Sequence, residues 1–133
     1  MTRSDARRNA FLYVFQLYAN DELILDDSLE LEDGLTLEAD EFTQEIVRNT
    51  VEHTAEIDEI ISANLKGWTL KRLPKVALAI LRISVAQMLY MKDVPTGAVI
   101  NEAVELSKHF GDQDDYQFIN GALGQIEKKL NQE

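Results

Sequence analysis

The sequence contains no cysteine, and several other marks of catalytic or membrane proteins are also missing from it. Without cysteine there is no disulfide, no thiolate nucleophile and no cysteine-ligated zinc site. The six glycines stand apart from one another, so the chain has no glycine-rich loop that could cradle a phosphate group. Its apolar runs are too short to span a bilayer, and the opening MTRSDARRNA has no apolar signal core. These absences favour a soluble cytoplasmic protein.

Catalytic and metal-binding patterns are equally scarce. The two histidines, His53 and His109, are far apart, and neither has a second candidate ligand at i+4. Glu105 precedes His109 by four residues, but a single Glu-x-x-x-His on a helix is a common accident. His53 falls on an apolar stripe, where a partly buried, hydrogen-bonded histidine is the more common interpretation. The serines lack the strand–turn–helix setting of a nucleophile elbow, and the acidic run lacks EF-hand spacing. We therefore predict a protein that is not an enzyme and that binds no cofactor or metal.

Charge is abundant but unevenly distributed. The 133 residues include 24 acidic and 13 basic side chains, which gives a net charge of −11. Residues 21–59 contain fifteen carboxylates and one base, residues 60–92 contain six bases and no carboxylate, and the first twenty residues add three arginines. Two basic segments in an acidic protein fit a local anionic partner. The bases could equally pair with the acidic segment as surface ion pairs, and charge alone leaves both interpretations open.

Apolar residues recur at helical spacing through most of the chain and alternate at strand spacing nowhere for long. The pattern predicts an all-α protein with one domain over residues 1–133. Gly67 should end the second long helix, Pro74 should open the next, and Gly111 should stop the one after that. Between Asp21 and Leu37 we expect an acidic loop with one short helix at most. The expected helices are Arg3 to Asn20, Asp40 to Leu65, one that begins at Pro74, Thr96 to Phe110, and Asp115 to Leu130.

Two asparagines stand in apolar settings, Asn101 and Asn120, and the second is followed by Gly121. Asn-Gly signals a hairpin only between strands, and here the surrounding spacing is helical. A glycine inside a helix costs about 1 kcal/mol relative to alanine, so we expect neighbouring helices to approach closely at Gly121, and also at Gly97 and Gly124. Because buried amides need partners, the two asparagines are expected to cap or cross-brace neighbouring helices.

Aromatic side chains accompany both basic segments. Phe11 and Tyr13 follow the first, and Trp68 and Tyr90 lie in the second. Aromatic rings combined with arginine and lysine are typical of single-stranded RNA binding, where bases stack on rings and cations contact phosphates. Most of these rings are also needed for the core. The pattern is therefore compatible with an RNA-binding surface but does not locate it.

Three segments carry a family pattern in the same order along the chain. The most specific is VPTGAVINEAVELSKHFGDQDDYQFINGAL, which combines Val-Pro, an Ile-Asn-Glu-Ala helix, a Lys-x-Phe-Gly stop and a Phe-Ile-Asn-Gly final helix. IDEIISANLKGWTLKRLPKVALAILRIS and the arginine-rich start are the other two. Together they resemble the family of the transcription antitermination factor NusB along nearly the full length. The resemblance implies an all-α NusB-like fold of two packed three-helix bundles.

The resemblance also implies a function without catalysis. Members of the family bind the boxA element of ribosomal or phage leader RNA jointly with NusE, a ribosomal small-subunit protein, and support elongation by RNA polymerase with other Nus factors. By position in the family motifs, the arginine-rich start, the last turn before Phe-Gly and the beginning of the final helix would lie at the RNA. The RNA-binding residues implied in this way are Arg3, Arg7, Arg8, Lys108, Asp114 and Phe118.

Phe15 and Ala77 fall where the family meets NusE. At this point the chain departs from the common pattern, with Ala77 in place of a frequent acid and Ala86-Gln87 in place of a frequent Tyr-Glu. If these positions face NusE, the loss of a carboxylate removes a charge pair from the interface.

Two alternatives stay open at this point. The same fold accompanies a catalytic domain at the N-terminus of certain ribosomal RNA methyltransferases, so the chain could be a non-catalytic protein-interaction module. No cofactor-binding strand–loop–helix follows before Glu133, which favours a free-standing factor. A homodimer formed through apolar patches on the first helix would instead cover the RNA-binding side.

Overall fold

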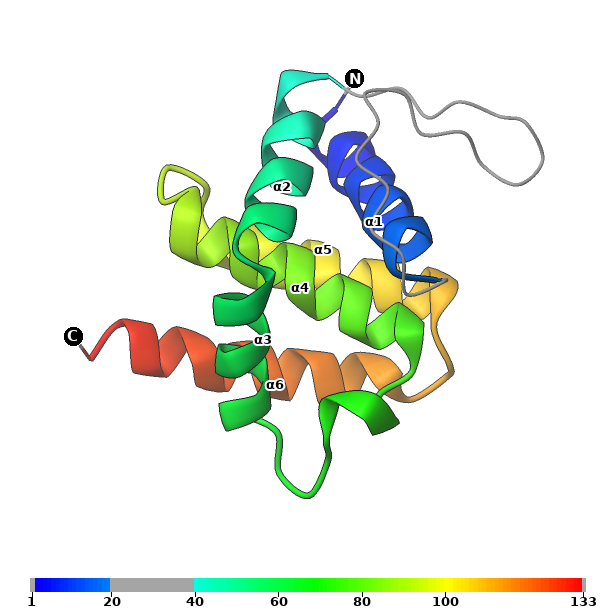
Figure 1. Cartoon of the computed structure of the whole chain (residues 1–133), viewed down its shortest axis with the longest axis vertical. Coiled ribbons are helices and arrows are strands. Elements are labelled where there is room, and N and C mark those ends of the chain that lie inside the picture. Colours follow the sequence, from blue (N-terminus) through cyan, green and yellow to red (C-terminus); the bar gives the residue numbers. More distant parts are fainter. Residues whose placement is uncertain (1, 20–39, 133) are drawn as a thin grey trace.

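The computed structural model describes residues 2–19 and 40–132, and all regular structure within these ranges is helical (Figure 1). The predicted all-α class is therefore confirmed, whereas the loop expected from Asp21 to Leu37 lies outside the described residues. None of the described helices is long and apolar enough to cross a membrane. The helices are α1 (Arg3–Ala19), α2 (Glu41–Glu52), α3 (Thr54–Ala63), the 3₁₀ turn η1 (Leu70–Arg72), α4 (Lys75–Tyr90), α5 (Thr96–Phe110) and α6 (Asp115–Leu130).

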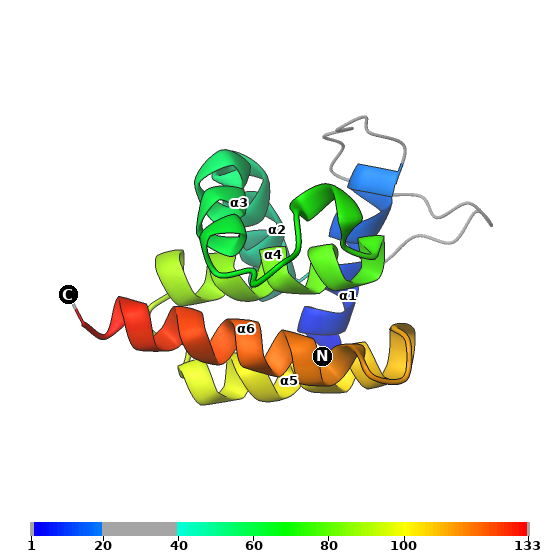
Figure 2. The same ribbon diagram turned by 90° about the horizontal axis from the view of Figure 1, so that it is seen from below.

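Helix α4 occupies the centre of the molecule. Its sequence is apolar nearly all round, which is typical of a helix covered on every side. Helices α5 and α6 pack below it in Figure 2, and α2 and α3 pack above it, while α1 joins the upper layer and reaches down beside α5. Helices α4 to α6 thus form one three-helix bundle, and α1 to α3 pack against it, as expected for the NusB-like fold.

One hydrophobic core joins the two layers. Its fully buried side chains come from both, and they are in contact through α4. Burial of such side chains, at about 25 cal/mol per Å² of apolar surface, is the main stabilising contribution to a domain of this size. Core members from five helices are Phe11, Ile46, Ile57, Ile80 and Leu123.

The long helix predicted over residues 40–65 is wrong in one respect, because it is divided at His53 into α2 and α3. Threonine side chains cluster at the break. The Thr50 Oγ1 donates to the carbonyl oxygen of Ile46 at 2.7 Å, and the Thr54 Oγ1 donates to that of Thr50 at 2.8 Å. Side-chain bonds of this kind compete with the backbone ladder and bend helices. The break lets α3 cross α4 and reach α6.

Helix ends follow local signals. The Asp40 carboxylate caps α2 by accepting from the Thr43 N–H at 2.8 Å and from its hydroxyl at 2.7 Å, and these bonds lower the pKa of Asp40. Pro74 directly precedes α4, as predicted. Helix α5 ends at Gly111, where a Cβ would lie 2.9 Å from the Ser107 carbonyl oxygen. The φ of Gly111 is −97°, which any residue can adopt, so its backbone conformation does not require glycine. The short distance to the Ser107 carbonyl oxygen leaves no room for a Cβ and does require it.

The roles predicted for the asparagines and three of the glycines are wrong. Asn101 and Asn120 are both exposed, so neither braces the interior. A Cβ built at Gly97, Gly121 or Gly124 would meet no neighbouring atom within 4 Å, so no helix approaches closely at these points. These residues belong to the surface.

Candidate functional site

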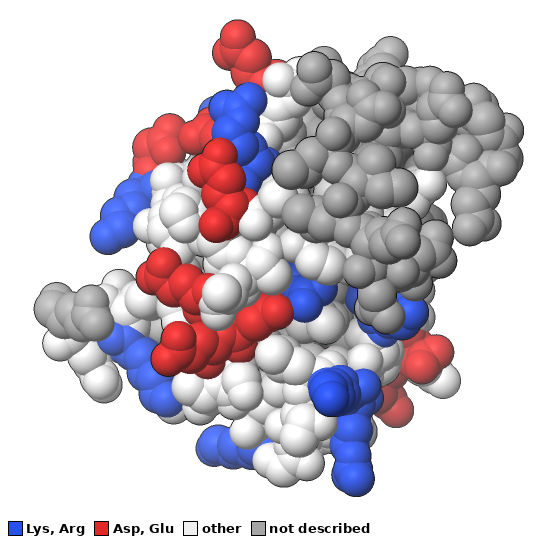
Figure 3. Space-filling model, viewed as in Figure 1, with Lys and Arg blue, Asp and Glu red and all other residues white. Residues whose placement is uncertain are grey.

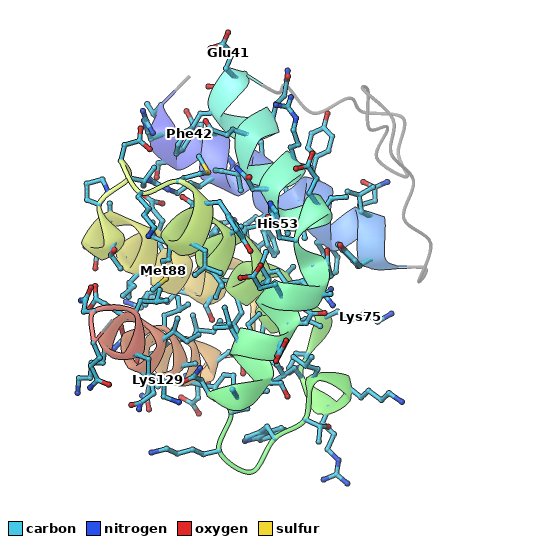
Figure 4. The ribbon with its side chains drawn as sticks, turned by 60° about the vertical axis from the view of Figure 1, so that its left-hand side comes forward. Glu41, Phe42, His53, Lys75, Met88 and Lys129 are labelled. Carbon is cyan, nitrogen blue, oxygen red and sulfur yellow. The ribbon has the colours of Figure 1, made fainter. Side chains whose placement is uncertain are left out.

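The three arginines of α1 occupy different environments. Arg3 is exposed, and its guanidinium lies 3.9 Å from the ring centroid of Phe42, which Figure 4 places between α2 and the start of α1. Arg7 is only 5% exposed, and its Nε donates to the Oε1 of Gln87 on α4 at 2.9 Å. The Arg8 side chain is half exposed. Of the three, Arg3 and Arg8 are open to a ligand from solvent.

Arg7 acts inside the protein. Burial holds the pKa of Arg7 below its usual value, the Glu102 carboxylate opposes this shift, and Arg3 adds to it. A guanidinium still keeps its charge in proteins, so the buried amide oxygen of Gln87 provides a necessary partner. The Gln87 Nε2 in turn donates to the Ile83 carbonyl oxygen at 3.0 Å. Arg7 therefore ties α1 to α4, and the RNA contact predicted for it stays a prediction.

Helices α1 and α5 run side by side in the same direction. The Ser4 Oγ donates to the Glu102 carboxylate, with distances of 2.7 and 2.8 Å to its two oxygens. Further along both helices, the ring centroids of Phe11 and Phe110 are 5.0 Å apart. Arg8 shares a helix face with Ser4 and Phe11. It therefore lies between these two contacts, as an exposed cation beside the C-terminal half of α5.

Most of the other predicted RNA-binding residues gather at the corner between α5 and α6. Lys108, in the last turn of α5, is half exposed, and its Nζ lies 5.0 Å from the ring centroid of Tyr116 in the first turn of α6. Asp114 directly precedes α6 and is exposed. Phe118 is partly buried, with its ring centroid 6.3 Å from that of Trp68. The three residues are close along the chain at the α5–α6 corner, but Lys108 contacts Tyr116 whereas Phe118 faces Trp68. Their contact with RNA stays a prediction.

The positions predicted to meet NusE lie largely inside the molecule. Phe15 is partly buried and stacks on Phe11 at 5.9 Å. Ala77, Ala86 and Gln87 are 1%, 0% and 1% exposed. The departures from the family pattern therefore change internal packing. The hypothesis that they remove a charge pair from a surface facing NusE stays a prediction.

Sequence reasoning did not place Trp68, which the structure exposes in the connection between α3 and α4. It is 51% exposed and is the one large apolar side chain in the described ranges that is open to solvent. It follows Gly67, whose φ of 77° requires glycine and turns the chain. Lys66, Lys71 and Arg72 of the same connection are exposed as well. The sequence showed that Trp68 stands among basic residues. It could not show whether the ring is exposed, because Trp68 lies outside any stretch of helical spacing.

Figure 3 shows acidic and basic side chains next to one another over α2 and areas of one sign lower on the face. Carboxylates gather over α3, and bases lie at the lower edge, where the α3–α4 connection runs. The Arg82 guanidinium makes a bidentate pair with Asp58, with both N–O distances at 2.8 Å, so for this base the ion-pair interpretation holds. Lys66, Lys71 and Arg72 form no ion pair with any described residue.

The histidines take part in ring contacts. His53 is partly buried, as predicted, and stacks on Tyr90 at 3.9 Å, at the junction of α2 and α3 (Figure 4). The Tyr90 hydroxyl donates to Glu56 at 2.6 Å, and burial together with this carboxylate raises the pKa of Tyr90 to about 12. His109 packs edge-on against Phe110 at 4.5 Å. In the described ranges no three His, Asp or Glu side chains are grouped so as to hold a metal ion.

Comparison with known proteins agrees with the observed fold. A model of the NusB family matches residues 4–128. The transcription antitermination protein NusB of Exiguobacterium sp. is 40% identical over 130 residues, which cover 97% of this chain and 99% of that protein. The NusB of Lysinibacillus sphaericus is 38% identical over 126 residues, or 95% and 97% of the two chains.

Solved structures show the same likeness. NusB of T. maritima superposes with a TM-score of 0.77 and 30% identity, over 96% of this chain and 92% of that one. The antitermination factors NusB and NusE have been solved in complex with double-stranded RNA, and one chain of that complex superposes with a TM-score of 0.76 and 28% identity over 96% of each chain. With a family match over most of its length and relatives near 40% identity, the chain belongs to the NusB family.

Proposed function

We propose that this protein is a transcription antitermination factor that binds boxA RNA of ribosomal RNA leaders jointly with NusE and supports processive elongation by RNA polymerase together with other Nus factors. The observation that carries the proposal is the nearly full-length match to NusB proteins. The similar complex of NusB and NusE with double-stranded RNA supports the choice of partners. In this role the protein acts in the cytoplasm as a single domain over residues 1–133, without catalysis and without a cofactor.

The RNA-binding surface in this proposal runs from α1 to the α5–α6 corner. Arg3, Arg8 and Lys108 contact phosphates because their side chains are exposed. Phe118 contacts a base, with Asp114 beside it at the start of α6. A net charge of −11 repels RNA elsewhere on the molecule. The strand is therefore confined to the surface that carries these cations, and NusE supplies further phosphate contacts.

For NusE we propose a contact that includes the exposed part of Phe15 on α1. Ala77 is buried and would act only through the packing beneath such a surface. A homodimer formed through the first helix would compete with both RNA and NusE. Light scattering at several protein concentrations, with and without NusE, separates a monomer that binds NusE from a self-associating chain.

The RNA assignment is tested by fluorescence anisotropy with labelled boxA RNA at several salt concentrations, with and without NusE. Each phosphate contact contributes about 0.7 to the slope of log K against log salt for a single strand, so Arg8→Ala with Lys108→Ala should lower the slope by about 1.4. Lys92→Ala is the control, because Lys92 is exposed at the other end of α5 and should leave the slope unchanged. An unchanged slope in the double variant contradicts the RNA surface. Absence of binding with and without NusE favours the protein-interaction module.

A further inference from the structure

A pocket of about 270 Å³ lies between the α3–α4 connection and α6. The Trp68 ring forms one wall, and it is tilted by 60° to the neighbouring Phe118 ring at a centroid distance of 6.3 Å. Since half of Trp68 is open to solvent, a planar group can stack on it without displacing the core. The residues of the wall that bear on the argument are Asn64, Lys66, Trp68, Gln117, Phe118 and Gly121.

Asn64 lines the pocket at the end of α3. Its Nδ2 donates to the Ile60 carbonyl oxygen at 2.8 Å, which fixes the side chain at the end of α3. Its Oδ1 is buried and has no hydrogen-bond partner among the described residues. Buried acceptors without a partner are rare because they cost free energy. Because this oxygen is also closed to solvent, an occupant of the pocket contacts other atoms of the wall.

Helix α6 is open toward the same pocket at Gly121. The residue is exposed, and a Cβ built on it meets no neighbouring atom within 4 Å. A glycine in mid-helix lowers stability relative to alanine, and no internal contact of the described structure requires one here. Without a side chain at this position, an occupant of the pocket can approach the α6 backbone.

The charges of the α3–α4 connection favour an anionic occupant, and one of them, Lys66, lines the pocket. Lys66, Lys71 and Arg72 are exposed and form no ion pair with any described residue, and residues 60–92 contain no carboxylate. The side-chain carboxylates of an acidic protein segment would attract these cations, but they supply no aromatic ring to stack on Trp68. A nucleotide strand supplies a planar ring and phosphates together.

We propose that this pocket binds one base of single-stranded RNA, which stacks on Trp68, while Lys71 and Arg72 contact adjacent phosphates. This inference rests on the proposed function and extends the RNA path from Phe118 onto the α3–α4 connection. A base paired within a duplex cannot reach the ring, so the pocket prefers a single strand to a double strand.

Trp68 is the chain's single tryptophan, so its fluorescence reports on this pocket alone. A titration of the full chain with a boxA-type RNA oligonucleotide should quench this fluorescence in parallel with the anisotropy change of the RNA. The same oligonucleotide annealed to its complement should quench it much less. Trp68→Ala should weaken binding of the single strand about fivefold or more, and Lys71→Ala with Arg72→Ala should lower the salt slope by about 1.4.

A pair of glycine variants separates binding from stability. Gly121→Ala and Gly124→Ala both place a methyl group on α6 in open space, so both should raise the melting temperature. Gly121 lines the pocket and Gly124 does not. Only Gly121→Ala should therefore weaken RNA binding.

The outcomes distinguish this inference from the proposed function. Suppose that RNA binds with a salt slope sensitive to Arg8→Ala, while the Trp68 fluorescence and the affinity of Gly121→Ala stay unchanged. The pocket proposal is then overturned, and the proposed function stands. Quenching by a polyglutamate peptide but not by RNA would assign the pocket to an acidic protein segment and overturn the inference. Absence of RNA binding by the parent chain, with and without NusE, overturns both.

Discussion

Replacement of Arg7 by alanine is expected to destabilise the protein, although the residue stands in an arginine-rich turn that faces RNA in our proposal. The variant loses the 2.9 Å hydrogen bond to Gln87 between two side chains that are 5% and 1% exposed. A hydrogen bond to a charged group contributes about 1.5–3 kcal/mol. Contact of the guanidinium with Phe42 at 5.4 Å adds about 0.5 kcal/mol. Because alanine also removes the cost of burying a charge, we expect a net loss near the lower end, about 2 kcal/mol.

The measurement is urea or thermal unfolding followed by circular dichroism. For a chain of this length a loss of about 2 kcal/mol corresponds to a fall in the melting temperature of about 6–10 °C. Arg8→Ala is the matched control, since an exposed substitution usually changes stability by no more than about 0.5 kcal/mol. It should instead lower the salt slope of RNA binding by about 0.7.

Coupling between Arg7 and Gln87 can be measured directly. Gln87→Met removes the same hydrogen bond from the other side, so Arg7→Ala should cost less in that background than in the parent chain. The internal role of Arg7 is refuted if Arg7→Ala leaves stability unchanged and lowers the salt slope as much as Arg8→Ala does. In that case the guanidinium reaches solvent and contacts phosphate.

Three further predictions concern stability. Asp40→Ala removes the cap of α2 and should lower the free energy of unfolding by about 1 kcal/mol at neutral pH. Because the pKa of the Asp40 carboxyl is lowered in the folded state, the difference in stability between parent and variant is full above pH 3.8. It should vanish as the pH falls through the folded-state pKa. Tyr90→Phe removes the donor to Glu56. Because the pKa of Tyr90 is raised to about 12, the parent should lose stability relative to this variant as pH rises from 10 to 12, which unfolding in alkaline buffers will test. Asp58→Ala leaves Arg82 without its bidentate partner and should cost about 1–3 kcal/mol in urea unfolding, whereas Asp58→Glu should restore part of the loss.

Helix ends were predictable where a signal lies within a few residues. The observed bounds of α5 and α6 equal those expected, and Pro74 marks the start of α4 as predicted. The break at His53 was missed because its cause is a set of hydrogen bonds from threonine side chains to carbonyl oxygens. Threonine is common inside helices and does not announce such bonds. Local composition alone therefore predicts one helix there instead of two.

The candidate site was less accessible to sequence reasoning, since its geometry depends on residues far apart in the chain. Arg7 and Arg8 have the same chemistry, yet the partner that buries Arg7 lies 80 residues away on α4. Asn120 lies next to an apolar stripe, and spacing cannot tell the edge of such a stripe from its centre. Family motifs brought Lys108 and Phe118 into the set, whereas Trp68 required the folded chain.

Because α4 is enclosed by all five of the other described α-helices, it has almost no face of its own to offer a ligand. Substitutions in α4 would affect RNA binding and NusE binding only by shifting the helices that surround it. They would therefore tend to weaken both kinds of binding together. A variant in α4 that separates the two activities would have to move one layer and leave the other in place. Surface helices such as α1 and α6 are the better targets for separating them.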